Sequence, residues 1–297
     1  MFIKEEVESH GIKMSIVPVG VLNDIKEDIL NFKEKEHLNG FQKWITNEAY
    51  VLELPDPEPD FTAKSIVITA TPFRMIKAFF KHKNKQAYHI FEFAKDGTQE
   101  FITDIFTSHG YKLQNIPWFP RKRLAVRSGL TEYGRNNITY ADGMGSYFGI
   151  ETYKSDMPCG EYTWREVKNM TVCDNCGICI DNCPTGSIRR DRFLIDNEIC
   201  LSHIFEMGQP LPDGLPKLNH HRLGGCYCCQ DMCPKNLEIL SNITETVEFS
   251  EEETNLLLSG TPIQNLPQNL SDKIHKYYMN NYYDVIPQNL DVLFQNV

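Results

Sequence analysis

The sequence of 297 residues has no run of about eighteen apolar residues, the length that a membrane-spanning helix needs. Its first 13 residues contain no apolar segment of the kind that marks a secretion signal. Basic residues are fewer than acidic ones, 30 against 40, and the formal charge of −10 disfavours a large uniform phosphate-binding surface. We therefore expect a cytoplasmic protein without a membrane partner and with at most a local basic patch.

Cysteine is absent from the first 158 residues, whereas nine of the ten cysteines fall between Cys173 and Cys233. The cytosol keeps thiols reduced, so this crowding indicates metal ligands rather than disulfides. A hydrophobic content of 41% is enough for an ordinary core elsewhere in the chain. We expect an α/β cofactor or substrate domain over residues 1–158, a metal-nucleated domain over 159–240 and a helical tail over 241–297.

The cysteine-free part alternates between strand-like and helical patterns, which indicates an α+β fold overall. The expected strands, which could form one sheet, are residues 14–19, 65–70 and 137–140. The expected helices are residues 24–32, 72–80 and 96–110, the last begun by a capping-box spacing. In the tail, Ser250 and Glu253 have the spacing of a capping box, Gly260 ends that helix, and a second helix follows over residues 271–278.

The first cysteine run has the spacing of bacterial ferredoxins, C-x2-C-x2-C-x3-C-P. In such runs three thiolates bind one [4Fe-4S] cluster and the fourth binds a second cluster. A zinc site would instead need two separated pairs of ligands. The run consists of Cys173, Cys176, Cys179 and Cys183, and Pro184 follows it.

A second set repeats the C-x3-C-P ending, and one cysteine stands between the two sets. If each cysteine before a proline crosses over, one cluster takes Cys173, Cys176, Cys179 and Cys233, and the other takes Cys183, Cys200, Cys226 and Cys229. Cys159 and Cys228 remain, and both are expected to be free thiols. Cys228 could alternatively replace its neighbour Cys229 as a ligand.

Two adjacent clusters form an electron-transfer chain, and a simple ferredoxin would need only residues 159–240. The long N-terminal part therefore suggests a catalytic cofactor or substrate domain that the clusters supply with electrons. An electron-transfer protein that reduces a redox partner without substrate chemistry of its own is the alternative. RNA binding without catalysis is a third interpretation.

Several segments resemble the epoxyqueuosine reductase family, the cobalamin-dependent enzymes of tRNA queuosine synthesis, which are related to reductive dehalogenases. The cysteine segment carries the most specific match. Residues 127–136 are similar to the family's Ala-Gly-Leu-Gly-Trp-x-Gly-Lys-Asn loop, and the other similar segments are residues 61–68, 145–156, 196–202 and 225–236.

The resemblance implies a nitroreductase-like N-terminal domain that binds a base-off corrinoid, a ferredoxin-like double-cluster module and a short helical tail. The absence of a D-x-H-x-x-G motif agrees with the base-off mode. By this resemblance the corrinoid is bound by Gly129, Asn136, Asn137, Gly145, Ser146, Ser202, His220 and His221. A ferredoxin or flavodoxin is the implied electron donor, and the oligomeric state is not indicated.

One departure concerns the proton donor. The family places an aspartate shortly before the Gly-Leu loop, but this chain has no acidic residue between Asp104 and Glu132. Reduction of an epoxide needs an acid within reach of the leaving oxygen. A tyrosine beside a cation could replace it, and Tyr133 with Arg135, or Tyr140, are the candidates.

Basic residues near the predicted helix that starts after Pro120, and between the cysteine sets, could contact an RNA backbone or an acidic redox partner. They are Arg121, Lys122, Arg123, Arg127, Arg189, Arg190 and Arg192. A tRNA partner is therefore possible, although a solvated helix face explains the same residues. The chain has no room for the long helical-repeat tail of many family members, which weakens the tRNA interpretation.

Overall fold

The computed structural model describes residues 2–55, 60–209, 222–295 and 297. The chain forms two compact units. Unit 1 comprises Met1–Phe73 and Phe93–Cys176, and unit 2 comprises Arg74–Glu92 and Gly177–Val297. Both contain helices and strands, so the expected mixed α+β class is confirmed. No helix of the described residues is both long enough and apolar enough to cross a membrane.

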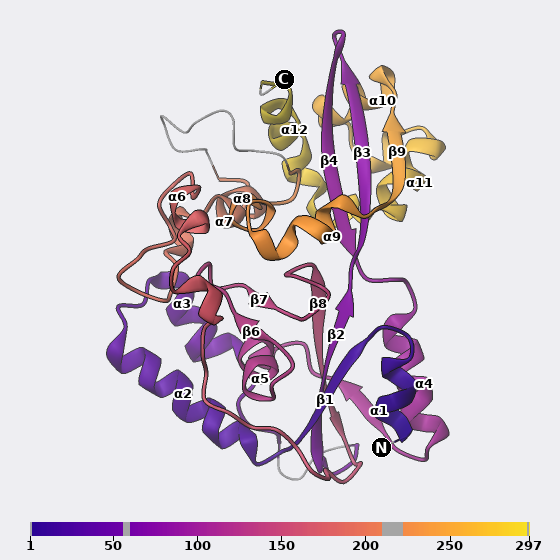
Figure 1. Cartoon of the computed structure of the whole chain (residues 1–297). Helices are drawn as coiled ribbons and strands as arrows, with labels where there is room; N and C mark the ends of the chain where they lie inside the picture. The colour runs from indigo at the N-terminus through magenta and orange to yellow at the C-terminus, as the bar shows by residue number, and fades with distance from the viewer. Residues whose placement is uncertain (1, 56–59, 210–221, 296) are drawn as a thin grey trace. The chain divides into compact units, whose positions relative to one another are not determined.

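Unit 1 is built on an antiparallel sheet with the strand order β1-β2-β8-β5. Apolar side chains cover both of its faces. Ile66 and Ile68 of β2 pack toward α2 and α5, whereas Val67 packs toward α1 and α4, because neighbouring residues of a strand point to opposite faces. Figure 1 shows α2 and α5 on one side of the sheet and α1 and α4 on the other. The elements are β1 Lys13–Pro18, β2 Ser65–Pro72, β8 Phe148–Ser155, β5 Leu113–Asn115, α1 Phe2–Glu8, α2 Val21–Lys35, α4 Thr98–Ser108 and α5 Arg121–Arg127.

Several smaller elements of unit 1 lie outside its main sheet. The helix α3 is capped by Asn39 and continues into the π-helical turn η1. The short strands β6 and β7 form a separate hairpin, so the expected inclusion of residues 137–140 in the main sheet is wrong. The bounds are α3 Gly40–Trp44, η1 Ile45–Ala49, β6 Glu132–Tyr133, β7 Thr139–Tyr140 and the 3-10 turn η2 Thr171–Cys173.

Unit 2 contains a three-stranded sheet, β4-β3-β9, in which β3 and β9 are parallel. The helix predicted over residues 72–80 is instead the strand β3. Its alternating burial fits a strand, and short apolar runs do not distinguish the two periods. Lys83 and Asn84, both with positive φ, make the tight turn to β4. The strands are β3 Arg74–His82, β4 Lys85–Phe93 and β9 Ile243–Phe249.

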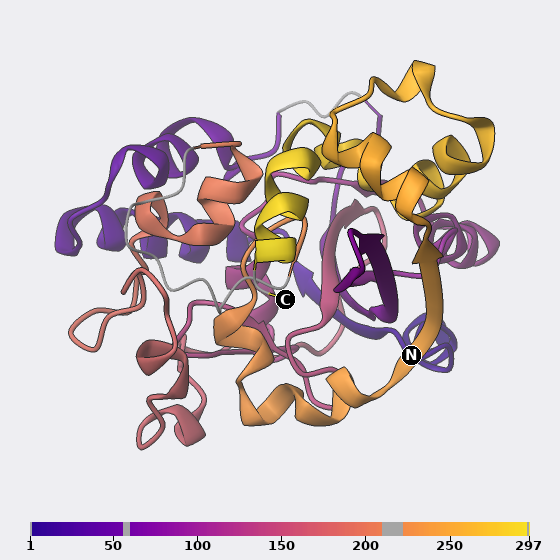
Figure 2. The same ribbon diagram turned by 90° about the horizontal axis from the view of Figure 1, so that it is seen from above.

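The C-terminal helices of unit 2 pack beside this sheet, as Figure 2 shows in yellow and orange. Phe80 stacks on Phe249 with ring centroids 4.5 Å apart, and Phe91 stacks on Tyr277 at 5.4 Å. The predicted helices of the tail are confirmed within a few residues. They are α10 Glu251–Leu258 and α11 Gln268–Lys276, whereas the third helix, α12 Ile286–Gln295, was not predicted, nor were the 3-10 turns η6 Ile263–Asn265 and η7 Met279–Val285.

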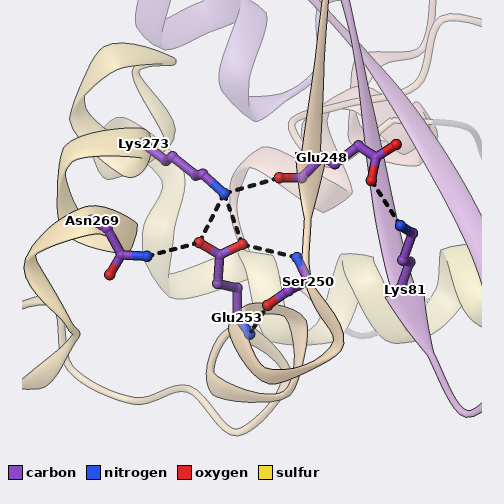
Figure 3. Close-up of polar contacts among 6 residues, drawn as sticks. All are labelled: Lys81, Glu248, Ser250, Glu253, Asn269 and Lys273. Atoms are coloured by element: carbon purple, nitrogen blue, oxygen red, sulfur yellow. Dashed lines mark hydrogen bonds and ion pairs between the residues drawn. The ribbon is translucent and has the colours of Figure 1, made fainter.

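The expected capping box of α10 is present (Figure 3). The Ser250 hydroxyl accepts from the backbone N–H of Glu253 at 3.1 Å, and the Glu253 carboxylate accepts from the backbone N–H of Ser250 at 2.8 Å. Lys273 of α11 donates to both carboxylate oxygens of Glu253 at 2.8 Å, and Asn269 donates at 3.3 Å. This network joins α10 and α11 to the end of β9. By contrast, α4 begins at Gly97 without a side-chain cap, so its predicted capping box is wrong.

Candidate iron–sulfur centre

The two cysteine sets fold into matching turns, each with one short helix. In the first set α6, Ile178–Asp181, carries Cys179, and in the second α8, Cys228–Asp231, carries Cys229. The backbone N–H of Cys183 donates to Ile180 at 3.2 Å, and that of Cys233 donates to Gln230 at 3.1 Å. Cys229 therefore occupies the place in its turn that Cys179 occupies in the other.

Further short elements of unit 2 lie between and after the two turns along the chain. They are the 3-10 turn η3 Asn197–Ile199, which precedes Cys200, the helix α7 Leu201–Glu206, the 3-10 turn η5 Pro234–Asn236 and the helix α9 Leu237–Ser241. All ten cysteines are partly buried and none forms a disulfide. This agrees with a role as ligands in a segment made of short helices and turns.

Three cysteines of the expected second cluster influence one another. Burial raises the pKa of Cys200, and the neighbouring Cys226 raises it further. The pKa of Cys226 is raised by a hydrogen bond with Cys228, by burial and by Cys183. Burial also raises the pKa of Cys183, but hydrogen bonds, the strongest from Ser187, outweigh it, so that the pKa of Cys183 is lowered overall. Thiols crowded in this way suit a cation, whose charge offsets the repulsion between thiolates.

The described residues hold no group of three side chains already set in the geometry of a metal site. The donor set nevertheless fits two [4Fe-4S] clusters, because thiolates are the preferred ligands of such clusters and two sets of four are available. Cys228 also lies beside Cys226, so the expectation that Cys228 is only a free thiol stays a prediction.

Unit 1 contains the loops expected to bind a corrinoid. Gly129 follows α5 with φ +78°, and Gly145 has φ +55°, conformations that favour glycine. Asn137, at φ 61°, makes the turn between β6 and β7. The Asn136 amide donates to the Tyr140 hydroxyl at 3.0 Å, and Ser146 is buried. These loops are tightly turned, and their part in cofactor binding stays a prediction.

The candidate proton donors are both buried. Tyr133 is 5% exposed, and burial raises its pKa well above the ordinary value while the nearby Arg123 acts in the opposite direction. The cation beside this tyrosine is thus Arg123, whose guanidinium lies 6.0 Å from the ring centroid, and Arg135 is half-buried. Sequence reasoning listed Arg123 only as part of a basic helix face and missed it as the cation beside Tyr133, because one helix turn and a loop separate the two residues.

Lys122 is a second titratable group at this loop that sequence reasoning did not single out as a proton donor. Its ammonium donates to the Asn137 carbonyl at 3.0 Å. The residue as a whole is exposed, but protein atoms surround the ammonium and lower its pKa. Because Lys122 lies after Pro120 at the start of a helix, its sequence context indicated only a basic helix face.

The remaining predicted cofactor residues belong to unit 2. Ser202 on α7 donates to Glu206 at 2.9 Å. A side chain on Gly225, which has φ +141°, would place its first carbon 3.0 Å from the Ser202 hydroxyl, so glycine is required there. His220 and His221 lie outside the described residues.

A buried ion network holds the second cysteine turn to the sheet of unit 2. The Arg222 side chain is 1% exposed and donates to Glu92 of β4 at 2.9 Å and to Asp231 of α8 at 2.8 Å. Its guanidinium also lies 4.5 Å from the Tyr227 ring centroid. Burial raises the pKa of Glu92 to about 7, although Arg222 and a hydrogen bond with Tyr227 act against this rise.

Comparison with known proteins first identifies the class of the metal-binding segment. The family described as "4Fe-4S double cluster binding domain" matches residues 172–236, which include the eight expected ligands. Over 161 residues the chain is 29% identical to the epoxyqueuosine reductase of Cyclobacterium marinum, across 52% of this chain and 50% of that protein. The chain thus spans about half the length of this curated relative.

Two solved structures share the fold. One is the epoxyqueuosine reductase of Bacillus subtilis with its catalytic aspartate loop swung out of the active site (TM-score 0.65, 18% identity, 99% of this chain and 80% of that chain). The other is an epoxyqueuosine reductase with a modified tRNA stem-loop (TM-score 0.64, 19% identity, 99% and 80%). The resemblance to the epoxyqueuosine reductases is therefore confirmed.

Proposed function

We propose that this chain is an iron–sulfur reductase of the epoxyqueuosine-reductase type. The carrying observation is the pair of matching cysteine turns within a chain that follows the fold of these enzymes over 99% of its length. Cys173, Cys176, Cys179 and Cys233 hold one cluster, and Cys183, Cys200, Cys226 and Cys229 hold the other. When bound, the clusters supply single electrons at low potential.

The resemblance extends this proposal to a base-off corrinoid in unit 1. Gly129 is exposed and Asn137 is half-buried, so their tight turns leave backbone groups at the surface without long side chains, which suits close approach of a large flat cofactor, whereas Gly145 is buried. Buried Ser146 and the Asn136–Tyr140 hydrogen bond keep these turns in place. We expect the protein with its clusters and corrinoid to act in the cytoplasm, where a ferredoxin or flavodoxin would donate the electrons.

This chain differs from the family in the residue that would donate a proton to the substrate. Residues 113–117, which begin with the strand β5, occupy the place where the family has its aspartate, and no acid follows until Glu132. Tyr133 stays protonated because burial raises its pKa, but a phenol of raised pKa releases its proton reluctantly. We therefore expect epoxyqueuosine reduction to be slow or absent, and a changed substrate to be the natural one.

The test combines composition with binding. Anaerobically reconstituted protein should contain about eight iron and eight sulfide per chain. It should also retain one cobalamin in equilibrium dialysis. About four iron per chain would contradict the two-cluster assignment.

Failure to bind cobalamin with cobalt in either the +3 or the +2 state, with both clusters present, would favour the second candidate. That candidate is an electron-transfer protein that reduces a corrinoid protein or another redox partner, and the same cysteine turns support it. A Tyr133→Phe or Tyr140→Phe variant that loses turnover, but keeps its cluster spectra, would identify the donor.

A further inference from the structure

Glu92, near the end of β4, is a buried acid that is linked to the second cysteine turn at two points. Its side chain is 8% exposed and accepts a hydrogen bond from Arg222 at 2.9 Å. The same guanidinium donates at 2.8 Å to Asp231 of α8, the helix that carries Cys229. The second link is a hydrogen bond between Glu92 and Tyr227, the residue that precedes α8. Glu92 is therefore joined through side chains to both ends of this short helix.

One positive charge lies between two acids in this network. Water does not offset the excess negative charge there, because the guanidinium of Arg222 is 1% exposed, and proton uptake by the more buried acid is therefore favourable. Burial raises the pKa of Glu92 to about 7, and the charge of Asp231 adds to this rise. Arg222 and the hydrogen bond with Tyr227 act in the opposite direction. Tyr282 of η7 also faces this acid, and burial and then Glu92 raise the pKa of Tyr282.

An electron on the second cluster would add negative charge beside this network. The expected ligands of that cluster are Cys183, Cys200, Cys226 and Cys229. Tyr227 lies between the last two of these ligands in the chain, and Asp231 follows them on α8. Water screens charges poorly at a buried site, so the charge of the electron acts strongly on a buried acid that is linked to the ligand turn. Uptake of a proton by Glu92 would offset this charge.

We propose that Glu92 takes up one proton from water when the second cluster receives one electron, and that it thereby makes the potential of this cluster depend on pH. The electron comes from a reduced ferredoxin or flavodoxin. An O–H bond forms on the carboxylate of Glu92, and no other covalent bond changes. Arg222 and Tyr227 are positioning residues, because they hold this carboxylate at the ligand turn. The inference rests on the proposed function, but only on its second cluster.

The test is a redox titration of the anaerobic full chain with both clusters assembled, from about pH 6 to about pH 9. Dithionite is the reductant, and electron paramagnetic resonance follows each cluster. Below about pH 7 Glu92 is protonated in both redox states, so the potential of the second cluster should be constant. Above this pH the potential should fall by up to about 59 mV per pH unit, the value of a tenfold change in a one-electron equilibrium. The signal that Cys200→Ala removes identifies the second cluster.

Three variants separate the role of Glu92 from a general effect of charge. Glu92→Gln keeps the size of the side chain but cannot ionise, so its potential should stay at the low-pH value of the wild type throughout. Glu238→Gln removes an exposed carboxylate on α9 and should keep the wild-type slope. Tyr227→Phe removes a hydrogen bond that lowers the pKa of Glu92, so the slope should begin at a higher pH.

Infrared spectroscopy tests the proton directly. The difference spectrum of reduced minus oxidised wild type at about pH 8 should gain a band of a protonated carboxyl group, and Glu92→Gln should lack this band. A potential that does not change with pH in the wild type, or a slope that survives in Glu92→Gln, would overturn the inference. Failure of the proposed function would be seen differently. About four iron per chain would remove the second cluster and overturn both proposals, whereas a wild type that binds no cobalamin or reduces no substrate would leave these potentials measurable.

Discussion

The sheet of unit 1 and the cysteine segment, residues 173–241, are stabilised by different contacts. In the sheet, apolar layers on both faces exclude water over long stretches of regular strand and helix. The described part of the cysteine segment buries few apolar side chains, namely Ile188, Leu201, Ile204, Phe205 and Leu223. Such a small core cannot offset the entropy of ordering the chain, so specific links must contribute more there.

Several of these links attach the second cysteine turn to the rest of unit 2. Besides the ion network of Arg222, the backbone N–H of Leu223 donates to the His89 ring at 3.2 Å, and Asn289 donates to the Leu223 carbonyl at 2.7 Å. Ligand bonds to the clusters would add the strongest links. The comparison teaches that the sheet should tolerate loss of single contacts better than the cysteine segment.

The largest effect is expected from removal of a cluster ligand. Cys176→Ala should lower the iron content to about half and destabilise the cysteine segment, because the ligand bonds of the lost cluster contribute folding free energy. The sheet of unit 1 should stay folded. Anaerobic iron analysis and limited proteolysis would measure both effects. Cys159→Ala is the matched control, and an equally stable cysteine segment in both variants would contradict the coupling of folding to cluster assembly.

Next in size is the loss of the buried arginine. Arg222→Met removes the guanidinium that donates to the carboxylates of Glu92 and Asp231, and breaking a buried pair in this way costs about 3–5 kcal/mol. Urea unfolding of the anaerobic holoprotein at pH 8 would measure it. Arg189→Met, which breaks an exposed pair with Asp191 in the same segment, should leave the unfolding transition unchanged. Equal transitions for the two variants would mean that burial of the Arg222 network is unimportant.

A smaller effect concerns the pH dependence of the same network. Because the folded state raises the pKa of Glu92 from 4.5 to about 7, the unfolded chain releases this proton first as pH rises. The stabilisation is complete below pH 4.5 and falls by about 3 kcal/mol by the time pH passes 7. Glu92→Gln should therefore gain stability relative to the wild type between pH 5 and pH 8. Parallel pH profiles of the two proteins would show that Glu92 ionises normally.

How accurately the sequence predicts these two regions depends on whether the deciding residues are neighbours in the chain or lie far apart in it. The spacing of Cys173 to Cys183 and the Ser250–Glu253 capping box are local patterns, and both correspond to the expected turns and helix. The helix predicted over residues 72–80 is wrong because a short apolar run fits both periods, and its strand character comes from pairing with β4 across a tight turn and with β9 far along the chain.

The parts of the site that sequence reasoning missed depend on long-range contacts. Arg222 meets Glu92 across 130 residues of sequence, and no spacing rule connects them. Arg123 and Tyr133 likewise come together only in the folded unit 1. Ligand spacing is readable from the chain, whereas the environment that anchors the ligands is formed by tertiary packing.

The smallest expected effect lies at the corner after the cysteine segment, where Figure 3 shows a half-buried polar network beside an exposed ion pair. Ser250→Ala removes the side-chain cap of α10 and leaves the Glu253 N–H without its acceptor, which costs about 1 kcal/mol. Lys81→Ala breaks only the exposed pair with Glu248 and should leave stability unchanged. Hydrogen exchange of the α10 amides should therefore accelerate in the first variant alone, by about fivefold if these amides exchange through opening of the helix. Equal exchange rates in both variants would mean that the polar links around Glu253 add nothing to the apolar contacts of α10. The stabilising role of specific links would then be limited to the cysteine segment.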